Sequence, residues 1–250
     1  MGSGVSRTAA EAIHLQRAYD APQAGDGVRV LVDHLWARGI SKAAAGLDAW
    51  MAALGPSDAL RTWFGHQPER WADFADKYRG ELLTPPRQTL LAALQGVAGR
   101  STLTLVYGAR DTKENEAVVL RQYLLQEQAR PAAAWDAPTK LLAVMAVVAA
   151  AHHDAVAPAA GVLMFASPLL TSGEMTDARS ALMANGQLRA VSGGWKLTAR
   201  AQKQVRQLQQ APDSASGSER PDPLRAPSAT QRGAGSPAPS SHEPCKATGV

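Results

Sequence analysis

Arginine and aspartate side chains follow two of the strands that the sequence predicts. Residues 33–39 (DHLWARG) come after one strand, and Arg110 and Asp111 come after another. Because open parallel sheets bind ligands beyond the carboxyl ends of their strands, these segments are expected to meet in one crevice. Arginines such as Arg38 and Arg110 suit a phosphate or carboxylate, and a helix that begins after Asp111 adds affinity for an anion. The sequence therefore predicts a site for a small anionic ligand. In the alternative interpretation, Asp111 only caps a helix and Asp33 pairs with Arg38.

A second group of reactive side chains lies in residues 63–71 (WFGHQPERW). His66 is a candidate general base, and Arg70 is a candidate residue at the rim of the crevice. The alternative is an aromatic turn that fills the core, with His66 bonded to the backbone. The candidate ligand-binding residues are Arg29, Asp33, Arg38, His66, Arg70, Arg110 and Asp111, and the catalytic candidates among them are Asp33, His66 and Asp111.

A third group is basic and lies near the C-terminal end of the predicted helices. No acidic residue occurs between Asp177 and Asp213. Phosphate contacts require a basic surface of this kind, so DNA is a candidate partner of residues 171–206. The alternative is a mildly basic module that docks on the first domain, since few side chains there can read bases. The candidate nucleic-acid-binding residues are Arg179, Arg189, Lys196, Arg200 and Lys203.

The sequence gives no sign of a metal or cofactor site. Cys245 is the only cysteine, which excludes an intramolecular disulfide and a cysteine-based zinc site. His152 and His153 are adjacent, and adjacent helical residues do not share a face, so a solvated helix end is expected instead of a metal site. No phosphate-binding glycine loop, nucleophile elbow or HExxH motif is present. We predict neither a metal nor a cofactor.

The elements that must position these residues alternate between strand and helix in the first half of the chain. Apolar or alternating runs predict strands at 12–19, 28–36 and 102–107. Cap residues and an aromatic stripe predict helices at 57–64 and 68–82, the second ended by Pro85 and Pro86. A short helix at 88–95 follows, and Asp111 with Glu114 resembles a capping box that opens a helix to about residue 126. This order predicts an α/β fold, a small layered and partly parallel sheet with flanking helices.

The second half of the chain predicts a small and mostly helical module. A helix at 138–153 precedes an apolar turn at 161–170, and Thr171 with Glu174 forms a capping-box signature for a helix to about residue 184. Two extended pieces, 188–191 and 195–197, are joined by a hairpin-like turn and followed by a helix at 199–209. Helix, helix, hairpin, helix is the order of a winged helix-turn-helix.

Composition limits the class of protein. The chain has 250 residues, 45% of them hydrophobic, and a net charge of +4, which is too small to indicate nucleic-acid binding by itself. The N-terminus lacks the apolar run of a signal peptide, and the longest apolar run, 141–151, is too short for a membrane span. We therefore expect a cytoplasmic protein with no membrane partner. The predicted organisation is a flexible N-terminus (1–11), an α/β domain (12–130), a winged-helix-like module (131–210) and a disordered tail (211–250), which is rich in Pro, Ser and Gly.

Six motifs of the first domain together resemble the domain-of-unknown-function 488 (YeaO-like) family over about residues 12–126. They are 15–20 (LQRAYD), 26–33 (DGVRVLVD), 36–39 (WARG), 63–66 (WFGH), 68–71 (PERW) and 107–111 (YGARD). The resemblance implies a small α/β domain without naming a reaction. The chain departs from the family pattern at His34, Ala37 and Gln67, where the resemblance leads one to expect Arg, Pro and Asp.

Three hypotheses of function remain open at this point. In the first, the α/β domain binds a small anionic molecule and the C-terminal module contacts DNA, as in a regulator. In the second, the protein is a hydrolase or transferase that acts on a phosphorylated or carboxylated metabolite. Arg38 and Arg110 would then hold the anion, Asp33 or Asp111 would be the acid or base, and His66 would assist. In the third, the protein is a non-catalytic interaction module.

Overall fold

The computed structural model describes residues 12–131 and 135–210. The predicted flexible N-terminus (1–11) and disordered tail (211–250) lie outside the described residues. The described residues all belong to one compact unit. The boundary at residue 130 therefore stays a prediction.

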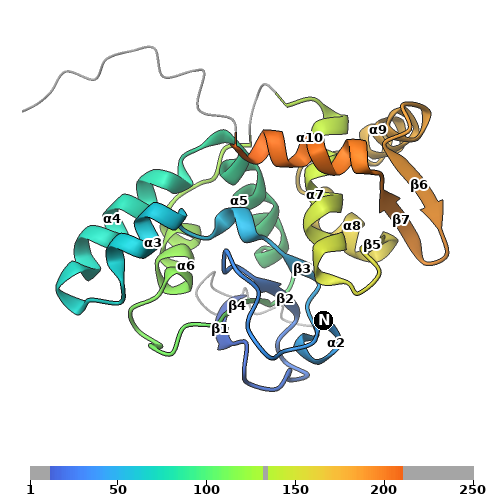
Figure 1. Cartoon of the computed structure of the whole chain (residues 1–250). Helices are drawn as coiled ribbons and strands as arrows, with labels where there is room; N and C mark the ends of the chain where they lie inside the picture. The colour runs from blue at the N-terminus through green and yellow to red at the C-terminus, as the bar shows by residue number, and fades with distance from the viewer. Residues whose placement is uncertain (1–11, 132–134, 211–250) are drawn as a thin grey trace, which may run out of the picture. The chain divides into compact units, whose positions relative to one another are not determined.

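Four strands form a parallel sheet in the order β1-β4-β2-β3 (Figure 1). β1 (Ile13–Arg17) and β2 (Val28–Leu31) both pair with β4 (Leu103–Tyr107), and β3 (Ala49–Trp50) pairs with β2 at the edge. Every residue of β2 and β4 is buried, as expected for central strands that are covered on both faces. The predicted α/β class is thus confirmed, although β2 ends earlier than the predicted strand 28–36.

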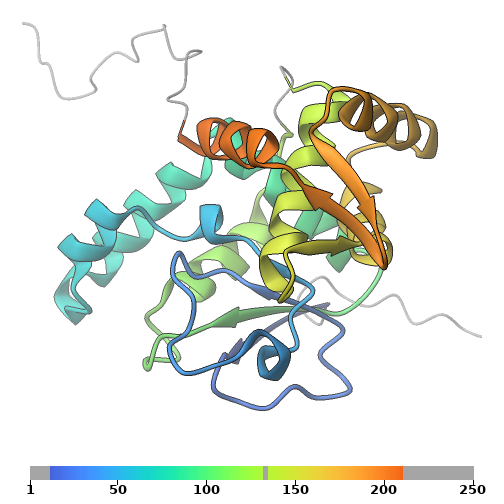
Figure 2. The ribbon, with the colours of Figure 1, turned by 45° about the vertical axis from the view of Figure 1, so that its right-hand side comes forward.

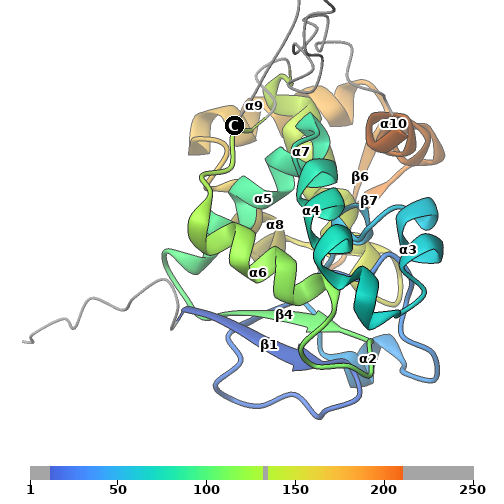
Figure 3. The same cartoon turned by 90° about the vertical axis from the view of Figure 1, so that its left-hand side faces the viewer.

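Four helices are associated with one face of this sheet (Figure 3). α5 (Pro85–Ala98) and α6 (Glu116–Gln126) contact β4, and α6 also contacts β1. α4 (Trp71–Leu82) packs on α6, and α3 (Asp58–Phe64) packs on α4. Two 3-10 turns, Ala52–Leu54 and Pro68–Arg70, join these elements. The apolar side chains between the helices and the strands form the main core.

The other face of the sheet has a smaller cover. Leu31 of β2 and Val106 of β4 pack there against the short helix α2 (Lys42–Ala45) and the indole rings of Trp36 and Trp50. Those two rings meet edge to face, with centroids 5.3 Å apart. This second cluster fixes the chain that follows β2, and that chain contains the first predicted site segment.

Two helix starts differ from the sequence prediction. Pro85 and Pro86 open α5 and do not merely end the helix before it, because a proline in the first turn has no intrahelical donor to lose. α6 begins at Glu116 and is capped by Asn115, whose side chain accepts from the backbone N–H of Val118 at 3.2 Å. The expected cap at Asp111 is therefore wrong by four residues.

The C-terminal elements form a helical module with a small antiparallel sheet (Figure 2). Its helices are α7 (Ala137–Ala151), α8 (Ala159–Ala166), α9 (Ser172–Ala184) and α10 (Ala199–Gln210). Its strands β5 (Val156–Pro158), β7 (Gly194–Leu197) and β6 (Leu188–Val191) are paired in that order. The capping box of Thr171 and Glu174 and the hairpin are present as predicted. The expected turn at 161–170 is wrong in its first half, since the chain from Ala159 to Ala166 is α8.

α7 explains the longest apolar run of the sequence. Leu142 and Val148 of this helix are fully buried, and α7 contacts β3, β5, α8, α9 and α10. A helix that is apolar on nearly all sides belongs in a core, and residues of α7, α8 and α10 share one continuous cluster with the parallel sheet. In the described part of the chain, no helix combines the length and apolarity that a membrane span requires.

Candidate functional site

A pocket of about 410 Å³ lies beyond the carboxyl ends of β2 and β4. Its charged and titratable lining residues include Asp33, Arg38, Arg61, His66 and Glu116. Its apolar wall includes Leu35, Trp36, Phe64 and Phe74. The pocket therefore occupies the place where open parallel sheets bind ligands.

Tryptophan side chains hold the loop after β2 in place. The indole N–H of Trp50 donates to the carbonyl of Asp33 at 2.9 Å. The indole N–H of Trp36 donates to the carbonyl of Ile40 at 2.8 Å. The first bond ties the loop to β3 and the second closes residues 36–40, so the loop presents Asp33 and Arg38 to the pocket from a fixed position.

Asp33 is tied to the loop after β4. Its Oδ2 accepts from the backbone N–H of Gly108 at 2.8 Å, and a Cβ added to residue 108 would lie 2.8 Å from that same oxygen. A side chain at residue 108 would thus push the carboxyl group away. The other oxygen of Asp33, Oδ1, is buried and has no N–H or O–H donor among the described residues.

Glu116 supplies a second carboxyl group to the same place. Its side chain is near enough to act on that of Asp33, and two carboxyl groups can share a hydrogen bond only if one of them holds a proton. Burial in the first place, and then the hydrogen bond and charge of Glu116, raise the pKa of Asp33 to about 9, against smaller opposing effects of the Gly108 N–H and Arg61. Glu116 is the first residue of α6. A carboxyl group with a pKa of about 9 is protonated at neutral pH, so Asp33 holds a proton there.

Three cationic or basic side chains surround this acidic pair. Arg38 is exposed and forms no ion pair within the described part of the chain. Arg61 donates to Asp58 at 2.6 Å on the surface of α3. His66 has a positive φ of 55°, which is uncommon for a residue other than glycine, and its ring meets Phe64 edge to face. The backbone at His66 is thus strained next to the pocket.

The predicted ligand site is brought together only in part. Asp33, Arg38 and His66 share the pocket, whereas Arg110 is exposed outside its lining. Asp111 is fully exposed, and its Oδ1 accepts from the backbone N–H groups of Lys113 at 2.7 Å and Glu114 at 3.0 Å. These bonds hold the pKa of Asp111 below its usual value.

The two remaining predicted residues have structural partners. Arg29 is buried, and its guanidinium bonds to Asp26, Gln16 and, at 3.4 Å, the carbonyl of Ala45. Arg70 donates to the carbonyl of Trp63 at 2.5 Å and lies over the ring of that residue, with 5.5 Å to the centroid. Neither lines the pocket.

Sequence reasoning missed Glu116 and Arg61. Glu116 was not predicted as a site residue because the helix was expected to start at Asp111, which made Glu114 the expected capping glutamate. A cap placed at Asn115 would have put Glu116 in the first turn, next to the loop after β4. Arg61 lies on a helix that was predicted, but nothing in its spacing distinguished it from a surface residue.

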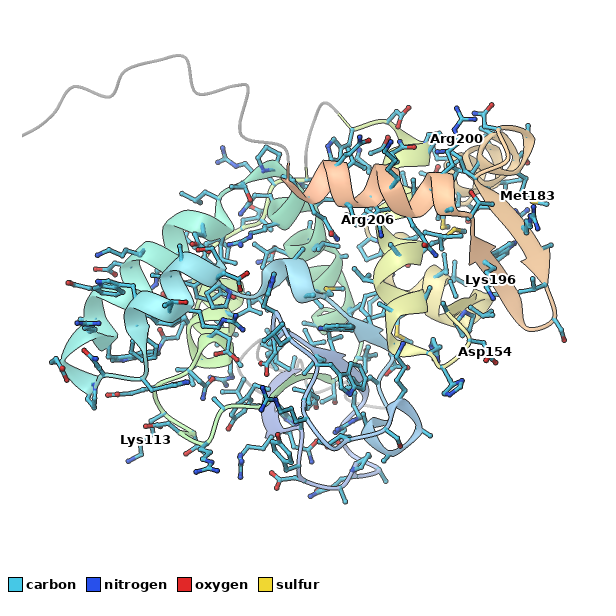
Figure 4. The ribbon with its side chains drawn as sticks, viewed as in Figure 1. Lys113, Asp154, Met183, Lys196, Arg200 and Arg206 are labelled. Carbon is cyan, nitrogen blue, oxygen red and sulfur yellow. The ribbon has the colours of Figure 1, made fainter. Side chains whose placement is uncertain are left out.

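The predicted nucleic-acid-binding residues lie in the C-terminal module. Arg189 and Lys196 are exposed and stand directly opposite each other on β6 and β7. The guanidinium of Arg179 lies over the ring of Trp195, 5.7 Å from its centroid. Arg200 and Lys203 are exposed on α10, and Figure 4 labels Arg200 there and Lys196 by the β6–β7 strands.

Of the two histidines at the end of α7, His152 belongs to the helix terminus and His153 does not. His152 is the C-cap residue, and Lys42 donates to the carbonyls of Ala150 at 2.6 Å and His152 at 3.0 Å. His153 is exposed and lies 3.3 Å from Asp154. Among the residues that the structure describes, no group of three or more His, Cys, Asp or Glu side chains is placed to hold a metal ion.

A comparison with protein families finds a match to the inactive DUF488-N3 subclade over residues 12–140. The chain belongs to the DUF488 family. It is 38% identical over 112 residues to the uncharacterized protein Rv3073c of Mycobacterium tuberculosis, which is 45% of this chain and 92% of that protein. It is also 38% identical over 112 residues to the uncharacterized protein YeaO of Escherichia coli, which is 45% of this chain and 96% of YeaO. No solved structure matches the chain.

The DUF488 match contains the whole pocket and ends inside α7. Two departures from the expected family pattern lie at or near the pocket. His34 lines it, and its Nδ1 lies 3.2 Å from the carbonyl of Ala52. Gln67 begins the 3-10 turn before α4 and makes no side-chain cap bond, as expected from the loss of an aspartate there.

Proposed function

We propose that this DUF488 protein is a non-catalytic binding protein whose pocket takes a small molecule with an anionic group. The observation that carries the proposal is the pocket at the carboxyl ends of β2 and β4, whose lining contains Arg38, a residue with no ion pair among residues 12–131 and 135–210. Such a guanidinium beside an apolar wall suits a carboxylate or phosphate attached to an apolar body. The proton on Asp33 lowers the negative charge that opposes the guanidinium of Arg38 in the pocket.

The same pocket suits the enzyme hypothesis less well. A perturbed carboxyl group such as Asp33 is a common mark of catalytic sites, and a carboxylic acid of this kind can donate a proton. However, the matching subclade is described as inactive, and that description favours binding without chemistry. The non-catalytic form is therefore our proposal, and substrate turnover would refute it.

A thermal-shift series tests the proposal with the full chain. The probes are inorganic phosphate, acetate, benzoate and 3-phenylpropionate at neutral pH. A bound probe raises the melting temperature, and the stabilisation grows with the logarithm of the probe concentration once that concentration exceeds the Kd. Arg38→Ala should abolish the shift. Arg110→Ala removes an equal charge from an exposed position outside the pocket and should preserve it. If no probe stabilises the protein, or if both variants lose the shift equally, the proposed site is wrong.

A second function, contact with nucleic acid, is favoured by the topology of the C-terminal module. α7, β5, α8, α9, β6 and β7 follow one another along the chain, and the strands pair in the antiparallel order β5-β7-β6. This is the order of a winged helix-turn-helix, in which α9 corresponds to the recognition helix and β6 with β7 to the wing. DNA-binding proteins with a helix-turn-helix place such a helix in the major groove.

The charges of the module support contact with phosphates through the wing. Arg189 and Lys196 are cross-strand neighbours, and like charges at directly opposite positions destabilise a sheet. A polyanion would relieve that repulsion. Because α9 carries the exposed acids Glu174 and Asp177, we place the phosphate contacts on the wing and on Arg200 and Lys203 of α10. A protein with this role would act in the cytoplasm.

Fluorescence anisotropy with a random duplex of about 20 base pairs tests this second function, with salt varied from about 50 to 200 mM. The double variant Arg189→Glu, Lys196→Glu should weaken binding by about tenfold or more and flatten the salt dependence. Lys113→Glu changes charge in the loop before α6, remote from the wing in Figure 4, and should leave binding nearly unchanged. Absent or salt-insensitive binding by the wild-type chain would refute the idea.

A further inference from the structure

The carboxyl groups of Asp33 and Glu116 give the pocket lining an acceptor-rich part. Among the described residues, their donors are the backbone N–H of Gly108, which bonds to Asp33 Oδ2 at 2.8 Å, and the one proton that the pair holds. Four carboxyl oxygens with so few donors suit a ligand that brings N–H donors of its own to this part of the lining.

The groups that face Asp33 come from each element around it. Glu116 of α6 and the Gly108 N–H bond to it, and Arg61 of α3 is near enough to favour its charged form. Burial raises the pKa of Tyr78 on α4 and the charge of Asp33 also contributes to that rise, but the hydroxyl of Tyr78 already donates to the carbonyl of Leu54 at 2.5 Å. Among these described groups, only the Gly108 N–H makes a direct hydrogen bond to Asp33 at a measured distance, 2.8 Å.

The rest of the pocket has the opposite character. Arg38 lies in the lining without an ion pair in the described structure, and Leu35, Phe64 and Phe74 provide apolar surface. One pocket of about 410 Å³ thus combines an acceptor-rich end, a cation and an apolar wall. These three features match three parts of one small molecule.

We propose that the pocket binds a small zwitterion, an α-amino acid with an apolar side chain. Its ammonium group donates to Asp33 and Glu116, its carboxylate bonds to Arg38, and its side chain lies on Phe64 and Leu35. The inference rests on the proposed function for the carboxylate and adds the recognition of the ammonium group.

Binding in this mode displaces a proton. In the free protein, one proton is held by the carboxyl pair, because burial and Glu116 keep Asp33 neutral. An ammonium ion supplies three N–H donors and a positive charge, which favour the Asp33 carboxylate. The Asp33 O–H bond breaks, the proton passes to the buffer, and the carboxylate accepts from the ligand. Affinity should therefore rise with pH, by up to about tenfold per unit below the pKa of Asp33.

Isothermal titration of the full chain with three related probes tests the inference. L-Phenylalanine carries both charged groups, 3-phenylpropionate lacks the ammonium, and phenethylamine lacks the carboxylate; L-leucine with 4-methylpentanoate provides an aliphatic set. We expect an amino acid to bind at least about tenfold more tightly than either partial analogue, the value of one charged hydrogen-bonded contact. Titration in PIPES and in Tris, which differ in ionisation enthalpy, should show release of about one proton per bound ligand.

Variants separate this inference from the proposed function. Asp33→Asn should abolish proton release and the preference for the amino acid, while 3-phenylpropionate still binds. Arg38→Ala should weaken both ligands. Asp111→Asn, an exposed carboxyl group outside the pocket, should change neither. Equal affinity for the amino acid and its deaminated analogue would overturn the zwitterion and leave the anion site standing, whereas no binding by any probe would overturn both.

Discussion

Replacing Asp33 by asparagine should stabilise the protein at neutral pH. In the folded chain, burial first and Glu116 second raise the pKa of Asp33 from 3.8 to about 9. Asparagine has the same shape and is always neutral, so it can accept from the Gly108 N–H and donate to Glu116. The variant thus keeps the bonds of the protonated carboxyl group without its titration.

The magnitude follows from the difference between the folded and unfolded pKa. The neutral form of Asp33 is favoured by folding, so its contribution to stability is fully present below pH 3.8 and is lost as pH rises toward 9. At pH 7, the unfolded chain has released this proton and the folded chain has not. Each pKa unit is worth about 1.4 kcal/mol, so the loss at pH 7 is about 4 kcal/mol. Asp33→Asn should recover it.

Urea unfolding followed by tryptophan fluorescence measures this effect. The free energy of unfolding of Asp33→Asn minus that of wild type should grow by about 1.4 kcal/mol per pH unit between about pH 5.5 and 8.5. Asp111→Asn is the control: the pKa of Asp111 is lowered by its backbone bonds, so its difference should stay flat over that range. A constant difference between Asp33→Asn and wild type would refute the proton on Asp33.

Three further predictions concern packing and caps. Gly96→Ala should destabilise the protein by about 1–3 kcal/mol, because the added Cβ would lie 2.2 Å from Pro168. Gly80→Ala should stabilise it by about 0.5–1 kcal/mol, because a Cβ there meets no described atom within 4 Å. Thermal unfolding of both variants checks the two signs. Lys42→Met should cost about 1.5–3 kcal/mol by freeing the last carbonyls of α7, and hydrogen exchange there should accelerate. Asn115→Ala should cost about 1–2 kcal/mol by uncapping α6, as urea unfolding would show.

The central strands and the place of the site could be predicted because they depend on local patterns. The β-branched, apolar run at 102–107 is buried on both faces. The rule that ligands bind beyond strand ends indicated where a pocket lies, and Asp33 and Arg38 line it, whereas Arg110 and Asp111, expected there by the same rule, do not. β3 could not be predicted, since two residues carry no periodicity. The prolines at 85 and 86 are equally suited to follow one helix or to start the next, and only packing decides.

The acidic pair shows why the rest of the site could not be predicted from the sequence. Asp111 is a residue type that often caps helices, and its side chain does accept from two backbone N–H groups, but these bonds close a turn and do not start a helix. Asn115 is buried, caps α6 and donates to the carbonyl of Asp111 at 2.8 Å. The position of Glu116 opposite Asp33 thus depends on which of two good cap residues is buried, and that is a property of the tertiary structure.

The contacts of α7 give a physical reason to treat the pocket and the C-terminal module as parts of one device. α7 covers the short edge strand β3, and Trp50 of that strand holds the carbonyl of Asp33. The chain that leaves the pocket after Arg38 continues into α2, where Lys42 bonds to the last carbonyls of α7. α7 in turn packs on β5 and α9. The loop after β2 and the elements β5, β7 and α9 are therefore all joined to α7, the loop through Trp50 and Lys42 and the others by direct packing. If the two proposed sites are coupled, α7 is the element that both of them contact, and coupling requires such a shared element.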